Sequence, residues 1–329
     1  MTGLPGRALA AAGILAGGML LVAAILAFGM RGTRPGARDF IEYWAAEQQL
    51  VDGRNPWEGV EILKLERGEG FGKDRPEFWY SPPPVLFLML PLGFVSAQTG
   101  MLLWGVVLFI LFAASVWSVW ILNGRPPGLL HLFGFLFAPA LVCIQAGQIS
   151  ILFLFGVVLF LCLHRSWPLL AGVALVPCAL KPHLFLPFGV VVLLWMVGEK
   201  AYRLVAGFGG VLLAGTALAY FFDRDAWTQY FRLMRSENPL NEYAPTVGQT
   251  FRELIHHDAA WLQFVPEVAA CAWAAWFFWT RRERWRWMSD GMLVLLVSVL
   301  CRPYGWIFDE SVLLPAVMTG MFRARESGR

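Results

Sequence analysis

Long apolar runs without charged residues recur along this chain. Hydrophobic residues make up 58% of its 329 residues and charged residues only 15%, and the mean hydropathy is +0.58. A helix needs about 20 apolar residues to cross the ~30 Å hydrocarbon core of a bilayer. The runs therefore predict an all-α polytopic membrane protein, folded as a single integral-membrane domain over residues 1–329. The short alternating segments of a transmembrane barrel are absent from the sequence.

Ten runs are predicted as membrane spans. The first, near the N-terminus, is too long for the core of a signal peptide and is interpreted as an uncleaved anchor. Several others are only 14–16 residues long. We expect these to extend into flanking polar residues, or to be broken where the protein shields the backbone from lipid. The runs are 8–30, 99–122, 129–143, 149–163, 167–180, 183–198, 202–222, 260–280, 287–301 and 307–322.

The distribution of Lys and Arg predicts the orientation of these spans. One further apolar stretch, residues 82–95, is short and contains Pro91 and Gly93, which suits an interfacial or re-entrant segment better than a span. If it does not cross, both termini lie inside, and the inner connectors carry nearly all the basic residues. If it crosses, that bias reverses. The positive-inside rule favours the first arrangement, a multi-pass protein of the plasma (inner) membrane with cytoplasmic termini.

This topology places the unusual polar segments on one side of the membrane. Two long polar loops, 31–98 and 223–259, are predicted to be outer loops. The turn from Gln145 to Gln148, the connector from Lys181 to His183 and the segment from Arg302 to Trp306 share that outer side. The residues that could carry chemistry are thus expected to converge.

Asp39 follows the first predicted span, in a loop rich in aromatic residues. Asp39 and Glu42 have the spacing of a capping box, in which Asp39 would cap the helix that follows. That helix would turn Phe40, Tyr43 and Trp44 toward lipid, as an interfacial helix of the first outer loop. A cap also fixes the position of a carboxylate, so capping and catalysis at the bilayer surface are compatible interpretations.

Two cations stand at outer ends of predicted spans. Lys181, between two apolar runs and before Pro182, is either a snorkelling anchor or part of a site for an anion such as phosphate. Arg302 is followed by Asp309 and Glu310, so an ion pair with either acid is the structural alternative to a functional role. The Gln148 turn has its own structural alternative, a turn whose hydrogen bonds are internally satisfied.

Several classes of function find no support. The net charge of +3 is too small to suggest nucleic acid. The sequence contains no Gly-rich phosphate loop, no HExxH, no GxSxG and no Cys/His metal set. We therefore expect no cofactor and no metal, and we expect any activated substrate to be a lipid already in the membrane.

Short motifs in a fixed order indicate a family. The first is Asp39-Phe40-x-x-Tyr43-x-Ala45-Ala46, followed by Leu50-x-x-Gly53-x-x-Pro56-Trp57. The others are Tyr80-Ser81-Pro82-Pro83, Pro91-Leu92, Gly147-Gln148, Lys181-Pro182, Gly248-Gln249-Thr250 and Arg302-Pro303-Tyr304-Gly305-Trp306. Together they resemble bacterial glycosyltransferase family 87, over about residues 35–320. These are GT-C enzymes typified by polyprenyl-phosphate-mannose-dependent mannosyltransferases.

The resemblance implies an inverting glycosyltransferase that acts on the outer face. Its donor would be a polyprenyl-phosphate sugar, and its acceptor an envelope glycolipid or glycan within the membrane lipids. An acid in the first outer loop would be the general base, a role that maps onto Asp39. Lys181, with His183 and Arg302, would stabilise the donor phosphate. The substrate-binding candidates are Tyr43, Tyr80, Gln148, Gln249 and Trp306.

Two other functions fit the apolar pattern. In a transporter or lipid flippase, Lys181, Arg302 and Glu267 would line a pathway, and Glu267 is expected inside the span 260–280. Such proteins often contain two related halves, and we find no convincing internal repeat. In a non-catalytic membrane scaffold, Asp39 and Lys181 would be freely replaceable.

Overall fold

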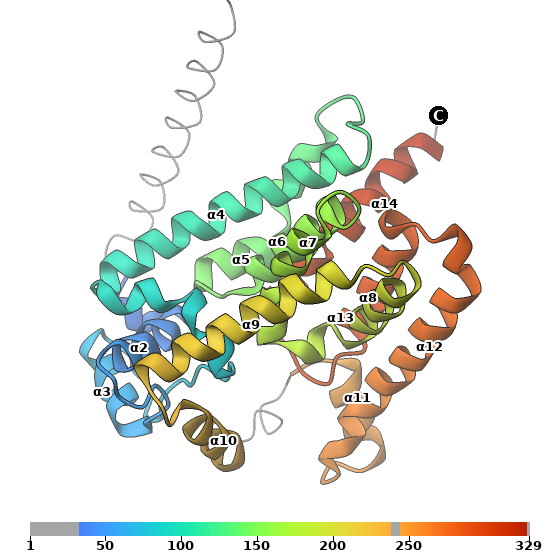
Figure 1. Ribbon diagram of the computed structural model, residues 1–329. Helices are drawn as coiled ribbons and strands as arrows, with labels where there is room; N and C mark the ends of the chain where they lie inside the picture. The colour runs from blue at the N-terminus through green and yellow to red at the C-terminus, as the bar shows by residue number, and fades with distance from the viewer. Residues whose placement is uncertain (1–32, 238–243, 328–329) are drawn as a thin grey trace, which may run out of the picture.

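The computed structural model describes residues 33–237 and 244–327, and within them every regular element is a helix (Figure 1). The predicted all-α class is confirmed. The first predicted span, 8–30, lies outside the described residues. The two long polar loops contribute helices that lie along one side, the lower side in Figure 1, whereas α14 ends on the upper side.

Within residues 33–237 and 244–327, two helices are long and apolar enough to cross a membrane: α4 (Ala97–Leu122) and α9 (Tyr202–Phe222). The helices in the other predicted spans that the structure describes are shorter, so the count of ten spans and the GT-C fold stay predictions. Their α-helical parts are α5 (Ala138–Ala146), α6 (Ser150–Leu163), α7 (Pro168–Ala174), α8 (Leu186–Gly198), α12 (Val265–Arg281), α13 (Met292–Leu300) and α14 (Leu314–Ser327).

Proline explains why many predicted spans are broken rather than continuous. Proline lacks the backbone N–H and clashes with the preceding helical turn, so it is tolerated only in the first turn of a helix. A 3-10 segment therefore precedes the α-helix in several spans: η4 (Leu130–Leu136) before α5, η8 (Ala260–Phe264) before α12 and η11 (Ile307–Leu313) before α14. The prolines that begin the helices are Pro139, Pro266 and Pro315.

Glycines allow α7 and α9 to cross at close range. α6 packs against α4 and against α7, and α7 packs against α9, so these helices form a continuous layer (Figure 1). A Cβ atom on Gly172 would lie 1.9 Å from the Leu204 carbonyl oxygen, and one on Gly207 would lie 2.0 Å from that of Leu169. Close backbone approach at small residues is how membrane helices gain packing without a hydrophobic driving force.

The first polar loop folds into α2 (Phe40–Val51) and α3 (Gly59–Gly68), after a short 3-10 helix, η1 (Pro35–Ala37). The prediction that α2 turns its aromatic side chains toward lipid is wrong. Phe40, Tyr43 and Trp44 are buried inside the protein instead of facing lipid. The reason is that η1, α3, α4 and a 3-10 segment of the same loop all contact α2 and cover its apolar side chains.

Residues 82–95 do not form a span. They fold into two 3-10 helices, η2 (Pro83–Leu88) and η3 (Leu90–Phe94), which pack against α9 and α2 respectively. Side chains of α2 satisfy the exposed backbone carbonyls: Trp44 Nε1 donates to Val95 O at 2.9 Å, and Gln48 Nε2 donates to Gly93 O at 2.9 Å. This segment thereby anchors α2 to the helical layer. The second polar loop contributes α10 (Ala226–Ser236) and α11 (Val247–Ile255).

Candidate active site

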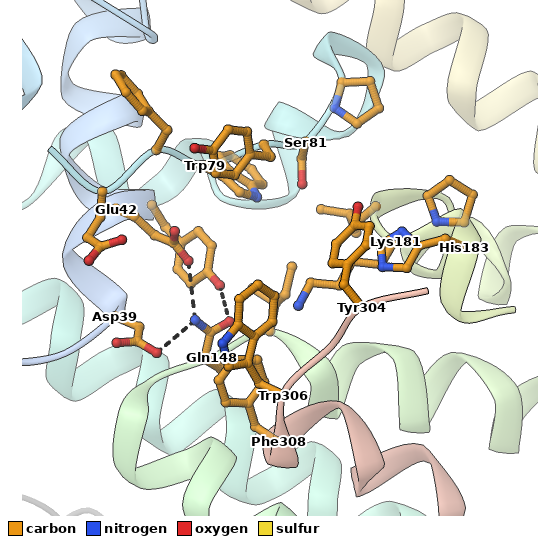
Figure 2. A pocket seen from close by; sticks show the side chains of 18 of the residues that line it. Asp39, Glu42, Trp79, Ser81, Gln148, Lys181, His183, Tyr304, Trp306 and Phe308 are labelled. Atoms are coloured by element: carbon orange, nitrogen blue, oxygen red, sulfur yellow. Dashed lines mark hydrogen bonds between the residues drawn. The ribbon is translucent and has the colours of Figure 1, made fainter. Parts of the chain in front are cut away.

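A cavity of about 520 Å³ opens among segments that are distant in the sequence (Figure 2). That volume lies in the range of small-molecule sites, ~300–1,000 Å³. Seven of the predicted site residues line it. They are Asp39, Tyr43, Tyr80, Gln148, Lys181, His183 and Trp306. The cavity therefore brings together most of the residues that the sequence placed on one side.

Asp39 lies directly before α2 at the edge of this cavity. Its backbone is already helical, with φ −62° and ψ −20°, and its side chain makes no capping hydrogen bond. The predicted capping box is therefore wrong, because a side-chain cap requires extended backbone at that position. Asp39 Oδ2 instead accepts a hydrogen bond of 2.9 Å from Gln148 Nε2. The carboxylate is exposed and directed toward the cavity (Figure 2).

Gln148 is hydrogen-bonded to three side chains of the α2 region. Its Nε2 donates to Asp39 at 2.9 Å and to Glu42 Oε1 at 3.3 Å, and its Oε1 accepts from the Tyr43 hydroxyl at 2.6 Å (Figure 2). A hydroxyl donor on the oxygen and two acceptors on the nitrogen are consistent with one orientation of the amide. Gln148 and Tyr43, predicted as substrate ligands, are thus also positioned to hold the acids in place.

The turn that carries Gln148 approaches α2 very closely. Gly147 ends α5 in the left-handed conformation, with φ +75°, and a Cβ atom there would lie 2.7 Å from Phe40 Cβ. Only glycine provides both the dihedral and the space. Two hydrogen bonds fix the turn: Trp104 Nε1 donates to Gly147 O at 2.8 Å, and Arg38 donates to Gln145 O at 2.7 Å.

Lys181 lies on another wall of the cavity and is paired with Asp309. The Nζ–Oδ1 distance is 2.9 Å, and the Asp309 side chain is only 1% exposed. Asp309 also accepts from Ser150 Oγ at 2.8 Å and from the backbone N–H of Trp306 at 3.0 Å. The ammonium lies 5.4 Å and 5.1 Å from the ring centroids of Trp306 and Phe308. These contacts hold the cation in one place, at the cavity surface.

His183 also lines the cavity, stacked on Tyr304 with ring centroids 3.9 Å apart. Burial, assisted by the charge of Lys181, lowers the pKa of His183 to about 3. The imidazole is therefore neutral at physiological pH. It can offer one N–H to a ligand but no positive charge.

Arg302 and Gln249 are not among the cavity-lining residues. Arg302 is buried and donates a hydrogen bond to Val299 O. It also forms an ion pair with Glu310 at 3.4 Å, which is the structural alternative predicted for this cation. Gln249 accepts a hydrogen bond from Gln263 and donates one to Glu253 at 2.7 Å. The lining of this cavity therefore does not support the predicted contact of Arg302 with the donor phosphate or that of Gln249 with the substrate.

The transporter alternative requires Lys181, Arg302 and Glu267 to line one pathway. Glu267 is in the first turn of α12 rather than deep within a helix, and it is absent from the cavity lining together with Arg302. Of the three residues required for that alternative, only Lys181 reaches the cavity.

Two acids of the cavity, Glu42 and Glu77, are not among the site residues predicted from the sequence. The sequence predicts Glu42 only as part of a helix cap, and Glu77 gives no distinct signal. Burial raises the pKa of Glu42 to about 8. The i, i+3 spacing of Asp39 and Glu42 could have indicated that both carboxyls share one side of a helix.

The cavity therefore offers a carboxylate, a second carboxyl, an ammonium group and aromatic walls. A carboxylate can accept a proton from a hydroxyl, and an ammonium can stabilise developing negative charge. Within residues 33–237 and 244–327, no group of three or more His, Cys, Asp and Glu side chains is suited to hold a metal ion.

Comparison with known proteins identifies a family. The model of glycosyltransferase family 87 matches residues 78–303, more than half of the chain. The matched range contains Tyr80, Gln148, Lys181 and His183 and begins after Asp39. No curated protein and no solved structure matches the chain.

Proposed function

The chain belongs to glycosyltransferase family 87, and from this we propose that it transfers mannose from a polyprenyl-phosphate donor to an envelope glycolipid or glycan. The reaction takes place on the outer face of the inner membrane and inverts the anomeric carbon. The observation that supports this proposal most strongly is that one cavity is lined by both Asp39 and Lys181. A base and a phosphate-binding cation are the two groups such a transfer needs.

In the proposed reaction, Asp39 removes the proton from an acceptor hydroxyl as its oxygen bonds to the anomeric carbon. The bond from that carbon to the phosphate oxygen breaks, and its electron pair leaves with the polyprenyl phosphate. Attack on the face opposite the leaving group is the arrangement that inverting glycosidases use with water. No general acid is required, because a phosphate is already a stable anionic leaving group.

Lys181 is the residue we propose for stabilising that phosphate. Its ammonium has three N–H donors, and one of them is directed to Asp309 at 2.9 Å. The others remain for phosphate oxygens, and the pairing fixes the ammonium before the donor binds. Preorganised donors of this kind need no rearrangement as charge develops. Neutral His183 would add one hydrogen bond, and Arg302, which is not among the lining residues, is assigned no contact.

Replacing Asp39 tests the proposal. The wild-type protein, purified in detergent, is given radiolabelled polyprenyl-phosphate mannose and a glycolipid extract from cells that lack the protein. Wild type should move label into the glycolipid fraction, and Asp39→Asn should reduce this by ~10²–10⁴-fold, the usual contribution of a general base. Asp52→Asn, at the exposed opposite end of α2, is the matched control and should retain activity.

Two results would contradict different parts of the proposal. Absence of transfer by the wild type would reject the donor assignment. Full activity of Asp39→Asn would reject Asp39 as the base while leaving the donor in place. Mass spectrometry of envelope glycolipids from a deletion strain then identifies the acceptor, because the unglycosylated precursor accumulates.

A further inference from the structure

Glu42 is a second carboxyl of the cavity, one helical turn after Asp39. We propose that Glu42 acts in its neutral, protonated form as a hydrogen-bond donor to the acceptor sugar whose hydroxyl Asp39 deprotonates. This inference rests on the proposed glycosyl transfer. It assigns the two neighbouring carboxyls opposite tasks: Asp39 accepts a proton, and Glu42 supplies a hydrogen bond without losing its own.

The shared contact with Gln148 places the two carboxyls side by side. One amide nitrogen donates to Asp39 Oδ2 at 2.9 Å and to Glu42 Oε1 at 3.3 Å, and the Tyr43 hydroxyl fixes the amide from its other end. Each carboxyl keeps a second oxygen for other partners, and both line the cavity (Figure 2). Neighbouring hydroxyls of one sugar ring could therefore reach both acids at once.

The environments of the two acids differ. Asp39 is exposed, whereas Glu42 is half-buried. No Lys or Arg in residues 33–237 or 244–327 forms an ion pair with Glu42. The nearby Lys181 is itself paired with Asp309. A carboxyl removed from water without a paired cation favours its uncharged form.

The charged and titratable groups around Glu42 lead to the same conclusion. Burial is the largest influence, and together with Asp39 and Glu77 it raises the pKa of Glu42 to about 8 against the opposing effects of Tyr43 and Lys181. Acid–base pairs are recognised by neighbouring groups whose environments separate their pKa values. A neutral Glu42 also avoids a second negative charge next to Asp39 and the donor phosphate.

The sign of the pH effect follows from this arrangement. Below about pH 8, Glu42 carries its proton and can donate a hydrogen bond. Above that pH it ionises, loses the donor and repels both Asp39 and the phosphate. Transfer by the wild type should therefore decline as the pH rises past about 8.

Glu42→Gln tests the role because glutamine is always neutral and still donates hydrogen bonds. The assay uses radiolabelled polyprenyl-phosphate mannose and the glycolipid extract. At pH 7 we expect the transfer rate of this variant to fall only about threefold, which is less than the loss of a whole hydrogen bond would cause. Its rate should no longer decline above pH 8. Glu42→Ala, which donates nothing, should lose about tenfold. Glu58→Gln makes the same chemical change at an exposed position outside the cavity and should keep the wild-type profile.

A loss in Glu42→Gln as large as that of Asp39→Asn would overturn the proposal, because it would mean that Glu42 must be charged. An unchanged alkaline decline in Glu42→Gln would overturn it as well.

Infrared spectroscopy of the purified protein provides a readout that does not depend on turnover. The readout is the difference spectrum of wild type minus Glu42→Gln, because Glu47 and Glu66 are buried carboxyls whose pKa values are also raised. The C=O stretch of one protonated carboxyl should be present in this difference at pH 7 and disappear with a midpoint near 8. Absence of that band from the difference spectrum would reject a neutral Glu42. If the band is present but the wild type transfers no sugar, the proposed function is rejected, and the hydrogen bond to the sugar with it, whereas the protonation state of Glu42 stands.

Discussion

A single amide group, that of Gln148, joins the turn after α5 to the first turn of α2. It contacts Asp39, Glu42 and Tyr43, and the backbone that carries it passes against Phe40. A displacement of this turn by a few tenths of an ångström would move the hydrogen bonds of both acids together. The geometry of the base therefore depends on a residue that never touches the reacting bond.

Gly147→Ala should reveal that dependence. The new methyl group would lie 2.7 Å from Phe40 Cβ and would force the turn away from α2. We expect a loss of transfer activity of about 10²-fold, the scale associated with a 1 Å displacement of a catalytic group. Measurement of the rate and of the melting temperature separates this effect from simple unfolding.

Gly124→Ala is the matched control for that experiment. Gly124 also has a positive φ, +79°, but nothing lies within 4 Å of the added Cβ atom. The left-handed backbone should cost each variant about 1 kcal/mol of folding stability. Only Gly147→Ala should also lose transfer activity, because only its methyl group meets α2. Equal transfer activity of the two variants would contradict the role of the close contact.

At the scale of single residues, the sequence identifies some of the cavity residues and misses others. Asp39 and Lys181 could be found because an ionisable residue beside an apolar run is costly and rare. The partner of Arg302 could only be narrowed to Asp309 or Glu310. In the structure, Arg302 forms an ion pair with Glu310, and Lys181 forms one with Asp309. That distribution depends on how irregular 3-10 backbone directs its side chains, which spacing in the sequence does not encode.

Among the helices, glycines bring α7 and α9 into close contact. Gly207→Ala should destabilise the protein by about 2 kcal/mol, because its Cβ atom would lie 2.0 Å from the Leu169 carbonyl oxygen and overpacked sites cost ~1–3 kcal/mol. The measurement is thermal unfolding in detergent. An unchanged or higher melting temperature would show that α7 and α9 do not pack as described.

Gly209→Ala and Gly210→Ala provide the control on the same helix. Nothing lies within 4 Å of the added Cβ atom at either position. Alanine is the better helix former by ~0.8–1 kcal/mol, so these variants should be neutral or slightly stabilised. The opposite sign at neighbouring positions identifies packing as the cause.

Hydrophobic periodicity predicts the broken helices but does not predict what covers the apolar side of a helix. The short predicted spans suggested broken helices, and the prolines at helix starts explain the breaks. The periodicity of α2, however, predicts a helix that faces lipid. An apolar side chain has the same pattern whether lipid or protein covers it, so the contacts of η3 with α2 could not be inferred from α2 alone.

For the whole molecule, the sequence predicted the all-α class and the convergence of distant polar segments, because hydropathy and charge bias act over the entire chain. It could not fix the number of spans, since a short apolar helix is equally compatible with crossing a bilayer and with lying inside a protein. Sidedness remains a prediction that a direct measurement can check.

Cysteine labelling in intact cells tests that sidedness. In a variant without the five native cysteines, a cysteine at Asp258, in the second polar loop, should react with a membrane-impermeant maleimide. A cysteine at Glu199, in a predicted inner connector, should react only after permeabilisation. Both positions are exposed, so the membrane alone should distinguish them. A reversed pattern would place the cavity on the cytoplasmic side.

The cavity lining comes from nearly the whole length of the chain, from Asp39 to Phe308. A growing polypeptide therefore acquires Asp39 and Glu42 early in synthesis and Lys181 midway, whereas Asp309, the counter-ion of Lys181, follows 128 residues later. Until then Lys181 lacks this ion pair, and the aromatic wall at Trp306 is missing. The cavity of a nascent protein inserted residue by residue is thus incomplete until the segment that carries Trp306 and Asp309 is in place.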